Sequence, residues 1–337
     1  MVTQPGSAVR RAAGLAIGII VLLGCFISSI RYGFVTVSWS DTWGALSGSN
    51  PESMEQLVVK TTRLPRALIA AAIGASLAMA GAIMQAVSRN PLASPSVMGI
   101  NAGASLSVVT AITVLSLTNM SVLTWFSFGG AAIAAAAVYV LGSMGREGLT
   151  PLKIILAGTA MSALFASFTQ GLLVRNENGL QDVMFWLAGS IAGREQSMLL
   201  AVLPYMGTGW IAAMLLSRQL NILVMGDEAA KGLGQRTALV KLASGLIIVA
   251  LAGGAVAVAG PIGFIGIVIP HIARSMIGLD YRWLLPYSAV LGAILLLGAD
   301  LAARFVIMPE EVPVGIMTAI IGAPFFIYIA RKELTSK

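Results

Sequence analysis

The stretch NILVMGDEAAKGLGQRTALV, residues 221–240, interrupts a chain that is otherwise almost continuously apolar. It holds a short charged, alanine-rich segment bounded by Gly226 on one side and by Gly232 and Gly234 on the other. Long hydrophobic runs lie before and after it. The stretch therefore indicates a polar connection between two hydrophobic segments.

The composition of the whole chain indicates a membrane protein. Of the 337 residues, 57% are hydrophobic and only 10% are charged, whereas soluble domains carry about 25% charged residues. The chain thus has too little polar surface for a soluble globule of its size. The 37 glycines fit this interpretation, because glycine is more frequent in membrane helices than in soluble ones. The single cysteine, Cys25, excludes an internal disulfide.

The hydrophobic runs predict an all-α polytopic membrane protein with about ten transmembrane helices. A helix needs about 20 apolar residues to cross a bilayer. The eighth run, GPIGFIGIVIPHIARSMIG, contains two prolines and four glycines and predicts a short or broken helix. The expected spans are 12–30, 66–88, 101–118, 122–144, 152–174, 198–217, 238–258, 260–279, 283–303 and 312–330.

The distribution of basic residues predicts the orientation. Ten spans place both termini on one side, and a cytoplasmic N-terminus puts 14 of the 21 basic residues in inner loops and termini. This excess matches the positive-inside rule. We therefore expect a cytoplasmic N-terminus at 1–11, one transmembrane domain at 12–330 and a cytoplasmic C-terminus at 331–337. The net charge of +7 reflects this topology, and we expect no nucleic-acid partner.

The N-terminus also resembles an export signal. Arg10 and Arg11 precede an apolar run, and Leu22 to Cys25 resembles a lipoprotein cleavage box. Nine more hydrophobic segments follow, so no soluble domain awaits export. We expect an uncleaved first span.

Motifs for catalysis and cofactor binding are absent from the sequence. There is no G-x-x-x-x-G-K-[ST] motif for ATP, and GPIGFIG lacks the glycine spacing of a dinucleotide site. One histidine and no cluster of Cys, His or carboxylates predict no metal site, and no G-x-S-x-G elbow is present. We expect no catalytic residues and no cofactor, which leaves transport, anchoring or signalling.

The spans are nearly free of ionisable residues. Asp300 is the main exception, and Arg304 follows one turn later, so the two can pair at i, i+4. Secondary transporters usually place such groups in mid-membrane to bind ions or relay protons. A local ion pair is favoured here over a proton relay. Because the spans then hold no charged groups for ion coupling, we expect another chain to supply the energy for transport.

The polar stretch itself predicts a very short helix. Asp227 and Glu228 suit the positive end of a helix dipole, Lys231 suits the last turn, and Gly232 or Gly234 can end the helix. So short a helix is unstable alone in water. The pattern leaves two interpretations open: a solvated, capped turn, or a helix that docks on a cytoplasmic motor.

Seven ordered blocks carry a family resemblance over residues 55 to 331. The blocks are RLPR (63–66), GASLAMAGAIMQAVSRNPLASPSVMGINAGA (74–104), WLAGS (186–190), GDEAAKGLG (226–234), GPIGFIGIVIPHIAR (260–274), GADLAARF (298–305) and EVPVGIMTAIIGAPFF (311–326). Through them the chain resembles the FecCD-type permease subunits of iron-siderophore, haem and cobalamin ABC importers.

The resemblance implies an inverted-repeat type II ABC importer permease architecture in the bacterial cytoplasmic membrane. It implies a passive pore for a ferric siderophore or related iron chelate, with haem or cobalamin as alternative cargoes. The implied partners are two ABC ATPase subunits that use ATP and Mg²⁺, a second permease chain, identical or homologous, and an extracytoplasmic substrate-binding protein. An ion-coupled secondary transporter and a non-transporting anchor or signalling partner are the alternatives from other classes.

The resemblance also implies two sets of site residues. The coupling loop, about 218–238, would contact the ATPase through Asp227, Glu228, Ala229, Ala230, Lys231, Gly232, Leu233 and Gly234. Arg63, Arg66 and Arg304 would dock the acidic lobes of the binding protein on the outer face. The alternative for the arginines is interfacial snorkelling by ordinary residues at the ends of spans.

Other landmarks are expected to be structural. The pairs Gly14/Gly18 and Gly99/Gly103 suit close helix packing, and His271 is expected to serve packing. Gln85 faces either the pathway or a neighbouring helix. A short internal echo relates SLAMAGAIMQ (76–85) to AVAVAGPIGF (255–264), five spans apart, as an inverted repeat requires.

Overall fold

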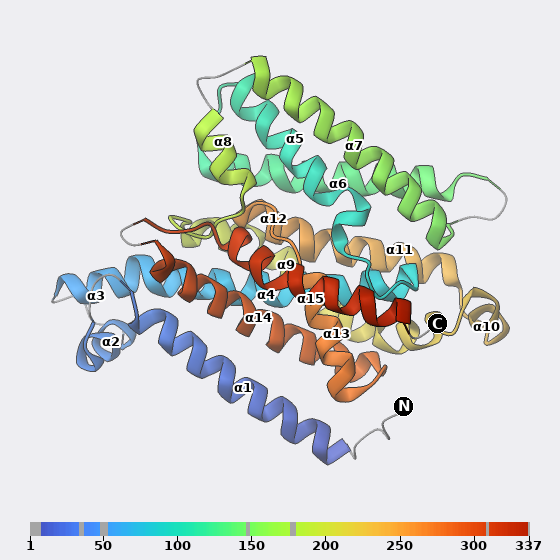
Figure 1. Ribbon diagram of the computed structural model, residues 1–337, viewed down its shortest axis with the longest axis horizontal. Coiled ribbons are helices and arrows are strands. Elements are labelled where there is room, and N and C mark those ends of the chain that lie inside the picture. Colours follow the sequence, from blue (N-terminus) through green and yellow to red (C-terminus); the bar gives the residue numbers. More distant parts are fainter. Residues whose placement is uncertain are drawn as a thin grey trace.

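The computed structural model describes residues 8–33, 37–47, 53–145, 149–175, 180–307 and 310–335. Within these ranges the regular structure is helical, apart from an isolated bridge between Ile307 and Glu310. Figure 1 shows the helices stacked as a bundle, with α5, α6 and α7 forming a group on one side of it.

The described residues contain seven helical segments that are long and apolar enough to cross a membrane, and three shorter apolar helices. They correspond one to one with the ten predicted spans. The long segments are α1 (Ala8–Arg31), α3–η1–α4 (Met54–Val58, Val59–Arg63, Leu64–Ser88), α6 (Met120–Ser143), α7 (Pro151–Arg175), α9 (Gln196–Leu223), α11–η4–α12 (Thr237–Ile248, Val249–Gly253, Gly254–Ala259) and α14 (Tyr281–Val306).

The three shorter helices are α5 (Ile100–Thr113), α13 (Ile265–Ile277) and α15 (Val314–Thr335). At about 1.5 Å per residue, α5 and α13 reach only about 20 Å, against a hydrocarbon core of about 30 Å. The short eighth span predicted from its prolines and glycines is confirmed in α13, whereas α5 is shorter than the span expected at 101–118. Short connecting elements complete the described chain: α2 (Trp39–Leu46), η2 (Pro95–Met98), α8 (Leu180–Leu187) and α10 (Asp227–Gly232).

The segment that ends in α4 is the centre of the bundle. In the most apolar 18-residue stretch of this segment, 78% of the residues are buried. The corresponding share is 11% in α1 and 17% in α7. It packs on α14, α13, α9 and α11. Its glycines allow this because a side chain at Gly74 would collide with the backbone of Gly292, and one at Gly81 with that of Gly266. Small residues at such crossings let membrane helices approach closely.

The predicted small-residue pairs have the same role. Gly14 and Gly18 of α1 face Tyr287 and Val290 of α14, and Gly103 of α5 lies against Gly130 of α6. The packing role predicted for them is confirmed. Gly99 differs, since it takes a left-handed conformation (φ 71°) between η2 and α5.

The predicted break in the eighth span is confirmed, but its helix begins at Ile265 and not at 260. α12 ends at Ala259, and Gly260 and Phe264 have positive φ angles of 73° and 66°. The irregular segment is held inside the protein: Ser190 donates its N–H to the Ala259 carbonyl at 2.8 Å, and Pro261 packs against Gly189. Lipid tolerates irregular backbone only where protein or a cavity surrounds it.

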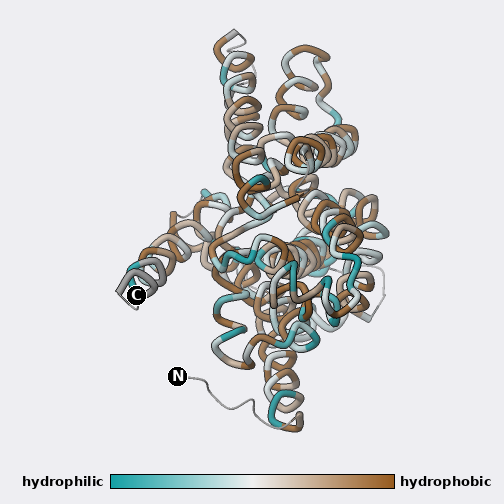
Figure 2. Tube along the Cα trace, turned by 90° about the vertical axis from the view of Figure 1, so that its right-hand side faces the viewer, coloured by the Kyte–Doolittle hydropathy of each residue, from teal (hydrophilic) through white to brown (hydrophobic). Residues whose placement is uncertain are grey.

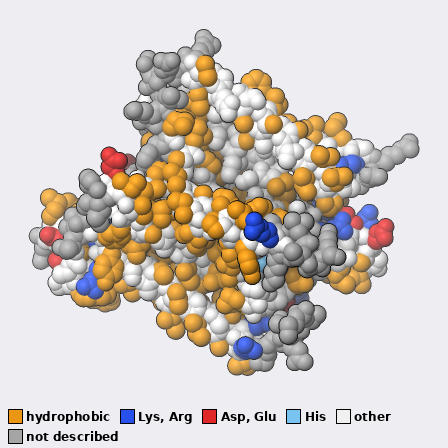
Figure 3. Space-filling view, viewed as in Figure 1, with side chains coloured by type: hydrophobic (Ala, Val, Ile, Leu, Met, Phe, Trp, Pro, Cys, Tyr) orange, Lys and Arg blue, Asp and Glu red, His pale blue; other side chains and the backbone are white. Residues whose placement is uncertain are grey.

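The arrangement of the helices gives the bundle two polar ends. In Figure 1 the start of α1, the end of α15 and α10 lie at the right-hand end, whereas α2, α3 and α8 lie at the opposite end. Apolar colour runs along most of each helix, and hydrophilic colour is confined to short stretches (Figure 2). On the face shown in Figure 3, hydrophobic side chains cover the middle and most of the charged ones lie toward the two ends.

Candidate functional site

The polar stretch folds into α10, which extends from Asp227 to Gly232. Gly226 opens the helix at φ 112°, and Gly234 follows it with φ 80°. The N–H of Leu233 donates to Ala229 and that of Gln235 to Ala230, at 3.1 and 2.9 Å. The predicted short helix is confirmed, and Gly234 supplies the left-handed stop.

α10 has an exposed face and an inner face. The side of α10 away from the bundle is exposed at Glu228, Ala229, Lys231, Gly232, Leu233 and Gly234, whereas Ala230 is fully buried. Leu233 is 64% exposed, and Met225 just before the helix is 67% exposed. A short helix that presents both apolar and charged groups at a polar end of the bundle can dock on another protein.

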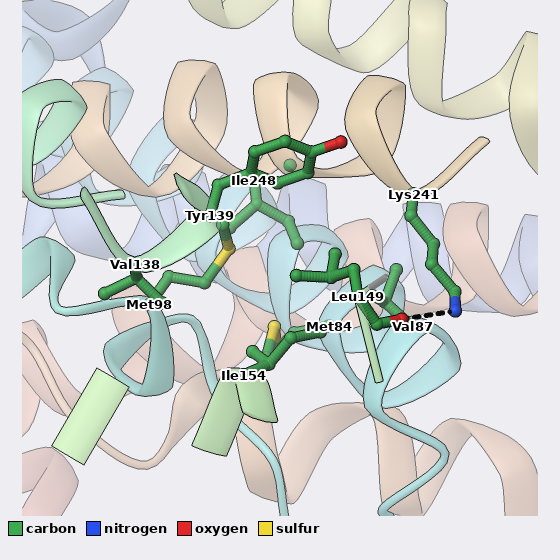
Figure 4. Close-up of a pocket in the computed structure, with 10 residues that line it drawn as sticks. Met84, Val87, Met98, Val138, Tyr139, Leu149, Ile154, Lys241 and Ile248 are labelled. Carbon is green, nitrogen blue, oxygen red and sulfur yellow. Dashed lines mark hydrogen bonds between the residues drawn. The ribbon is translucent and has the colours of Figure 1, made fainter. Parts of the chain in front are cut away.

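The inner face is attached to the bundle through Asp227. Its Oδ2 accepts a hydrogen bond of 2.7 Å from Lys241 Nζ on α11. Lys241 Nζ also donates to the Leu149 carbonyl, just before α7, at 2.9 Å (Figure 4). Arg89, the residue that ends α4, holds its Nη2 3.9 Å from Asp227 Oδ2. The side chain of Gln235 adds a bond of 2.9 Å to the Gln219 carbonyl of α9.

The cavity beside Lys241 is not a ligand pocket. It is lined mainly by apolar side chains, among them Met84, Met98 and Ile248, and its volume is about 10 Å³. One water molecule needs roughly that much room. The cavity lies where α4, α6, α7 and α11 meet (Figure 4).

A second polar cluster lies at the opposite end of α4, around Asp300. Arg66 donates from Nε and Nη2 to the Asp300 carboxylate at 2.9 and 2.8 Å, and from Nη1 to Glu311 Oε2 at 2.7 Å. Arg304 Nη2 donates to Asp300 Oδ2 at 2.6 Å. Asp300 is fully buried. The predicted Asp300–Arg304 pair is confirmed, and Arg66 joins it from another helix.

Arg63 and Arg304 also cap the C-terminal end of α1. Arg63 Nη1 donates to the carbonyls of Ile30 and Arg31 at 3.1 and 2.6 Å, and Arg304 Nη1 donates to that of Ser29 at 2.8 Å. Cations at this end suit the unpaired carbonyls and the negative pole of the helix.

The three arginines of the predicted docking set are thus brought together, but inside the protein. Arg63, Arg66 and Arg304 are only 5%, 8% and 4% exposed, and each is bound to other groups of the chain. They do not snorkel into a lipid interface. Their contact with a binding protein stays a prediction.

Gln85 and His271 both contact neighbouring helices. Gln85 of α4 donates to the Gly266 carbonyl at 3.1 Å and accepts a hydrogen bond from Arg274 of α13. Of the two directions that the sequence left open for Gln85, the structure therefore shows the one toward a neighbouring helix. His271 of α13 packs edge-on against Phe325 of α15, with ring centroids 6.0 Å apart.

The residue Asn221 connects α9 to the start of α14. Its Nδ2 donates to Asp280 Oδ1, and its Oδ1 accepts from the N–H of Tyr281, both at 2.8 Å. Asp280 caps α14, and hydrogen bonding from the Arg282 guanidinium lowers the pKa of Asp280 from 3.8 to about 2. This connection fixes the polar end of the bundle close to α10.

Sequence reasoning missed Lys241, Arg89, Glu311 and Asn221 as members of these clusters. A signal existed only for Lys241, a lysine near the start of an apolar span, where ionisable groups usually have a partner. The other three lie in loops or at helix ends, and nothing local to them indicates their distant partners.

In the part of the chain that the structure describes, ten apolar helical segments surround a buried centre, with polar clusters at both ends. This arrangement defines a polytopic helical membrane protein. Comparison of the sequence with known families specifies it further. The profile of the FecCD transport family matches residues 20–332, and the chain belongs to this family.

Relatives match the chain almost end to end. It is 54% identical to the "Probable siderophore transport system permease protein YfiZ" of Bacillus subtilis (strain 168), over 93% of this chain and 94% of that protein. It is 49% identical to the Fe(3+)-citrate import system permease protein YfmD of the same organism, over 83% of each. It is 37% identical to the ferric enterobactin transport system permease protein FepD of Escherichia coli (strain K12), over 97% of each.

A solved structure has the same fold. Its title is "An inward-facing conformation of a putative metal-chelate type ABC transporter". It aligns with 95% of this chain and 99% of its own, with a TM-score of 0.84 and 28% sequence identity. The all-α permease architecture predicted from the sequence is therefore confirmed.

Proposed function

We propose that this chain is the permease subunit of an ATP-driven importer in the bacterial cytoplasmic membrane, and that its cargo is a ferric siderophore or a related iron chelate. Its family and the iron-chelate systems named for its relatives support the proposal. Haem and cobalamin are weaker alternatives, because none of these relatives is named for them.

The structural feature that best supports the proposal is the exposed short helix α10. The helix is too short to be stable alone, it is attached to the bundle on one side, and it exposes Glu228, Lys231 and Leu233 on the other. A separate ATPase subunit that receives this face could move the bundle. In an assembly of two permease chains, identical or homologous, two such helices would serve two ATPase subunits. This chain is then a passive pore, and its partners use ATP and Mg²⁺.

The opposite end of the bundle suits a binding protein with acidic lobes. Arg63, Arg66 and Arg304 outnumber Asp300 and Glu311 in the buried cluster by one charge. A net positive charge steers an acidic partner toward this end. Docking through these arginines is part of the proposal, and it requires the partner to reach groups that the chain now encloses.

The same geometry supports a cytoplasmic location for both termini. The start of α1, the end of α15 and α10 share one end of the bundle (Figure 1). This end faces the cytoplasm if α10 meets an ATPase. The prevalence of Lys and Arg in the loops of this end fits the positive-inside rule.

Co-purification tests the proposal. The tagged chain is isolated in mild detergent from its native host, and the expected result is a P-loop ATPase at about one copy per permease. Leu233→Arg places a charge on the exposed apolar tip of α10 and should reduce the bound ATPase at least tenfold. Trp43→Arg changes another highly exposed side chain, 75% accessible, at the other end of the bundle and should retain the bound ATPase.

A chain that purifies without any ATPase, while a control complex survives the same detergent, would overturn the proposal. Co-purified permease would decide whether the second permease is identical or homologous. The identity of a co-purified binding protein would decide the cargo class.

A further inference from the structure

Asp227 faces the opposite way from the rest of the exposed segment of α10. Its neighbours Glu228 and Ala229 are exposed, whereas the Asp227 side chain is only 26% exposed and its carboxylate bonds to Lys241 of the bundle. Its second oxygen, Oδ1, is buried and has no hydrogen-bond partner within the described residues. A residue in this orientation is poorly placed to contact a partner on the outside of α10.

Lys241 is the junction of three elements. Its side chain is 5% exposed and lies on α11. One ammonium group reaches both Asp227 of α10 and the Leu149 carbonyl that precedes α7, at 2.7 and 2.9 Å. Figure 4 shows the side chain extending along the apolar cavity wall toward Leu149. A buried ammonium needs such partners, because an uncompensated charge there is costly.

Arg89 extends the junction to α4. It ends that helix in a left-handed conformation, φ 48°, and its guanidinium lies over Gly226 as well as near Asp227. A side chain at Gly226 would meet Arg89 Nη1 at 3.4 Å. α4 is the central helix of the bundle and packs on α14 and α13. Displacement of α10 therefore acts on α4 and α11 together.

We infer that Asp227 and Lys241 form a strut that transmits movement of α10 to α4 and α11, and that Asp227 is a positioning residue and not an ATPase contact. The inference rests on the proposed function and deepens it. The face of α10 that points away from the bundle receives the ATPase, and the Asp227–Lys241–Arg89 cluster carries the displacement into the bundle. A separate hydrogen bond joins Gln235, just after α10, to the Gln219 carbonyl of α9. It does not involve Asp227, Lys241 or Arg89.

The test uses the complete complex of this chain with its ATPase and binding protein, purified from the native host and reconstituted in liposomes. Three quantities are measured: the amount of ATPase bound, basal ATP hydrolysis, and the stimulation of hydrolysis by the binding protein. Stimulation requires a signal to pass through the permease, and it can be measured whatever the cargo is.

The informative variants are Asp227→Asn, Lys241→Met and the two combined. We expect the bound ATPase and basal hydrolysis to stay within twofold of wild type, and stimulation to fall at least fivefold in each single variant. The double variant should be no worse than either single one, since residues that act as one pair are not additive. Lys241→Arg keeps the cation and should retain most of the stimulation.

Glu228→Gln is the matched control, because it removes a carboxylate from the face of the same turn that the ATPase would contact. A lower amount of bound ATPase is expected of this variant, so hydrolysis is normalised to the bound ATPase, and the ratio of stimulated to basal hydrolysis should stay unchanged. The inference is overturned if Asp227→Asn releases the ATPase while Lys241→Met behaves as wild type, or if every variant keeps full stimulation. If the Lys241→Met variant does not accumulate, the Asp227→Asn variant alone tests the inference: reduced stimulation with bound ATPase supports it, and loss of the ATPase overturns it. A wild-type complex that contains no ATPase would instead refute the proposed function.

Discussion

The charged residues with the strongest structural constraint are those around Asp300. The carboxylate is fully buried and accepts from both Arg66 and Arg304. The spacing of Asp300 and Arg304 predicts their pairing from the sequence, because residues at i, i+4 lie on one helix face. The involvement of Arg66 could not be predicted, since it depends on how α4 crosses α14.

Replacement of Asp300 by Asn should destabilise the protein strongly. It leaves two buried guanidinium groups facing a neutral amide, and breaking a buried pair costs about 3–5 kcal/mol. The measurement is thermal unfolding of the purified protein in detergent. Glu311→Gln is the control: that side chain is 29% exposed and bonds to Arg66 alone, so its loss should cost less, about 1.5 kcal/mol. Equal stability of the two variants would contradict the cluster's structural role.

The residue Asp280 offers a pH test at the start of α14. Hydrogen bonding from Arg282 lowers its pKa to about 2 in the folded chain, against 3.8 ordinarily. The unfolded state therefore binds the proton more readily, and the ionised group stabilises the fold at pH values above 3.8. This contribution is lost as the pH falls from 3.8 toward 2. Asp280→Asn keeps a capping side chain without the charge.

We expect Asp280→Asn to be less stable than wild type at pH 6 and to approach wild type at pH 2. Chemical denaturation at the two pH values measures the difference. A difference that stays constant with pH would show that the charge of Asp280 has no stabilising role.

At the scale of the elements, glycine determines how the helices pack. Gly74 and Gly81 of α4 bring that helix against the backbones of α14 and α13. The sequence could predict the existence of all ten helices, because a long apolar segment in lipid can satisfy its backbone hydrogen bonds within itself only as a helix. It also predicted that the eighth span is short or broken. It could not predict that α5 ends at Thr113, since Leu115 and Leu117 beyond it are themselves apolar enough to extend the hydrophobic run.

Substitution at a helix crossing should therefore depend on the position. Gly74→Val would force a side chain into the backbone of Gly292, and overpacking of this kind costs about 1–3 kcal/mol or more. Gly129→Ala should be nearly neutral, because nothing lies within 4 Å of the added carbon. Unfolding midpoints of the two variants provide the measurement. Similar losses at both positions would contradict the close crossing of α4 and α14.

At the scale of the whole molecule, the two ends of the bundle differ in the polar groups that they carry. One end carries α10 and the ends of α1 and α15, and the other carries α2 and the arginine cluster (Figure 1). Charge counting predicts which end faces the cytoplasm. It does not predict that the proposed docking arginines are enclosed, because burial arises from helices far apart in the sequence.

Cysteine labelling in intact cells tests this orientation. The chain has one cysteine, Cys25, and Cys25→Ala provides a background for Leu233→Cys and Trp43→Cys, both at highly exposed positions. A membrane-impermeant maleimide should label the Trp43→Cys variant in intact cells and the Leu233→Cys variant only after the cells are opened. The reverse pattern would place α10 outside and exclude its contact with a cytoplasmic ATPase.

The most direct test of the central claim is transport by the reconstituted complex. Radio-labelled ferric citrate and a ferric hydroxamate are presented with the binding protein to liposomes that contain ATP on the ATPase side. The account predicts uptake that requires ATP hydrolysis and persists when a protonophore abolishes ion gradients. Uptake by the permease alone, without ATP and abolished by the protonophore, would contradict it and identify a secondary transporter.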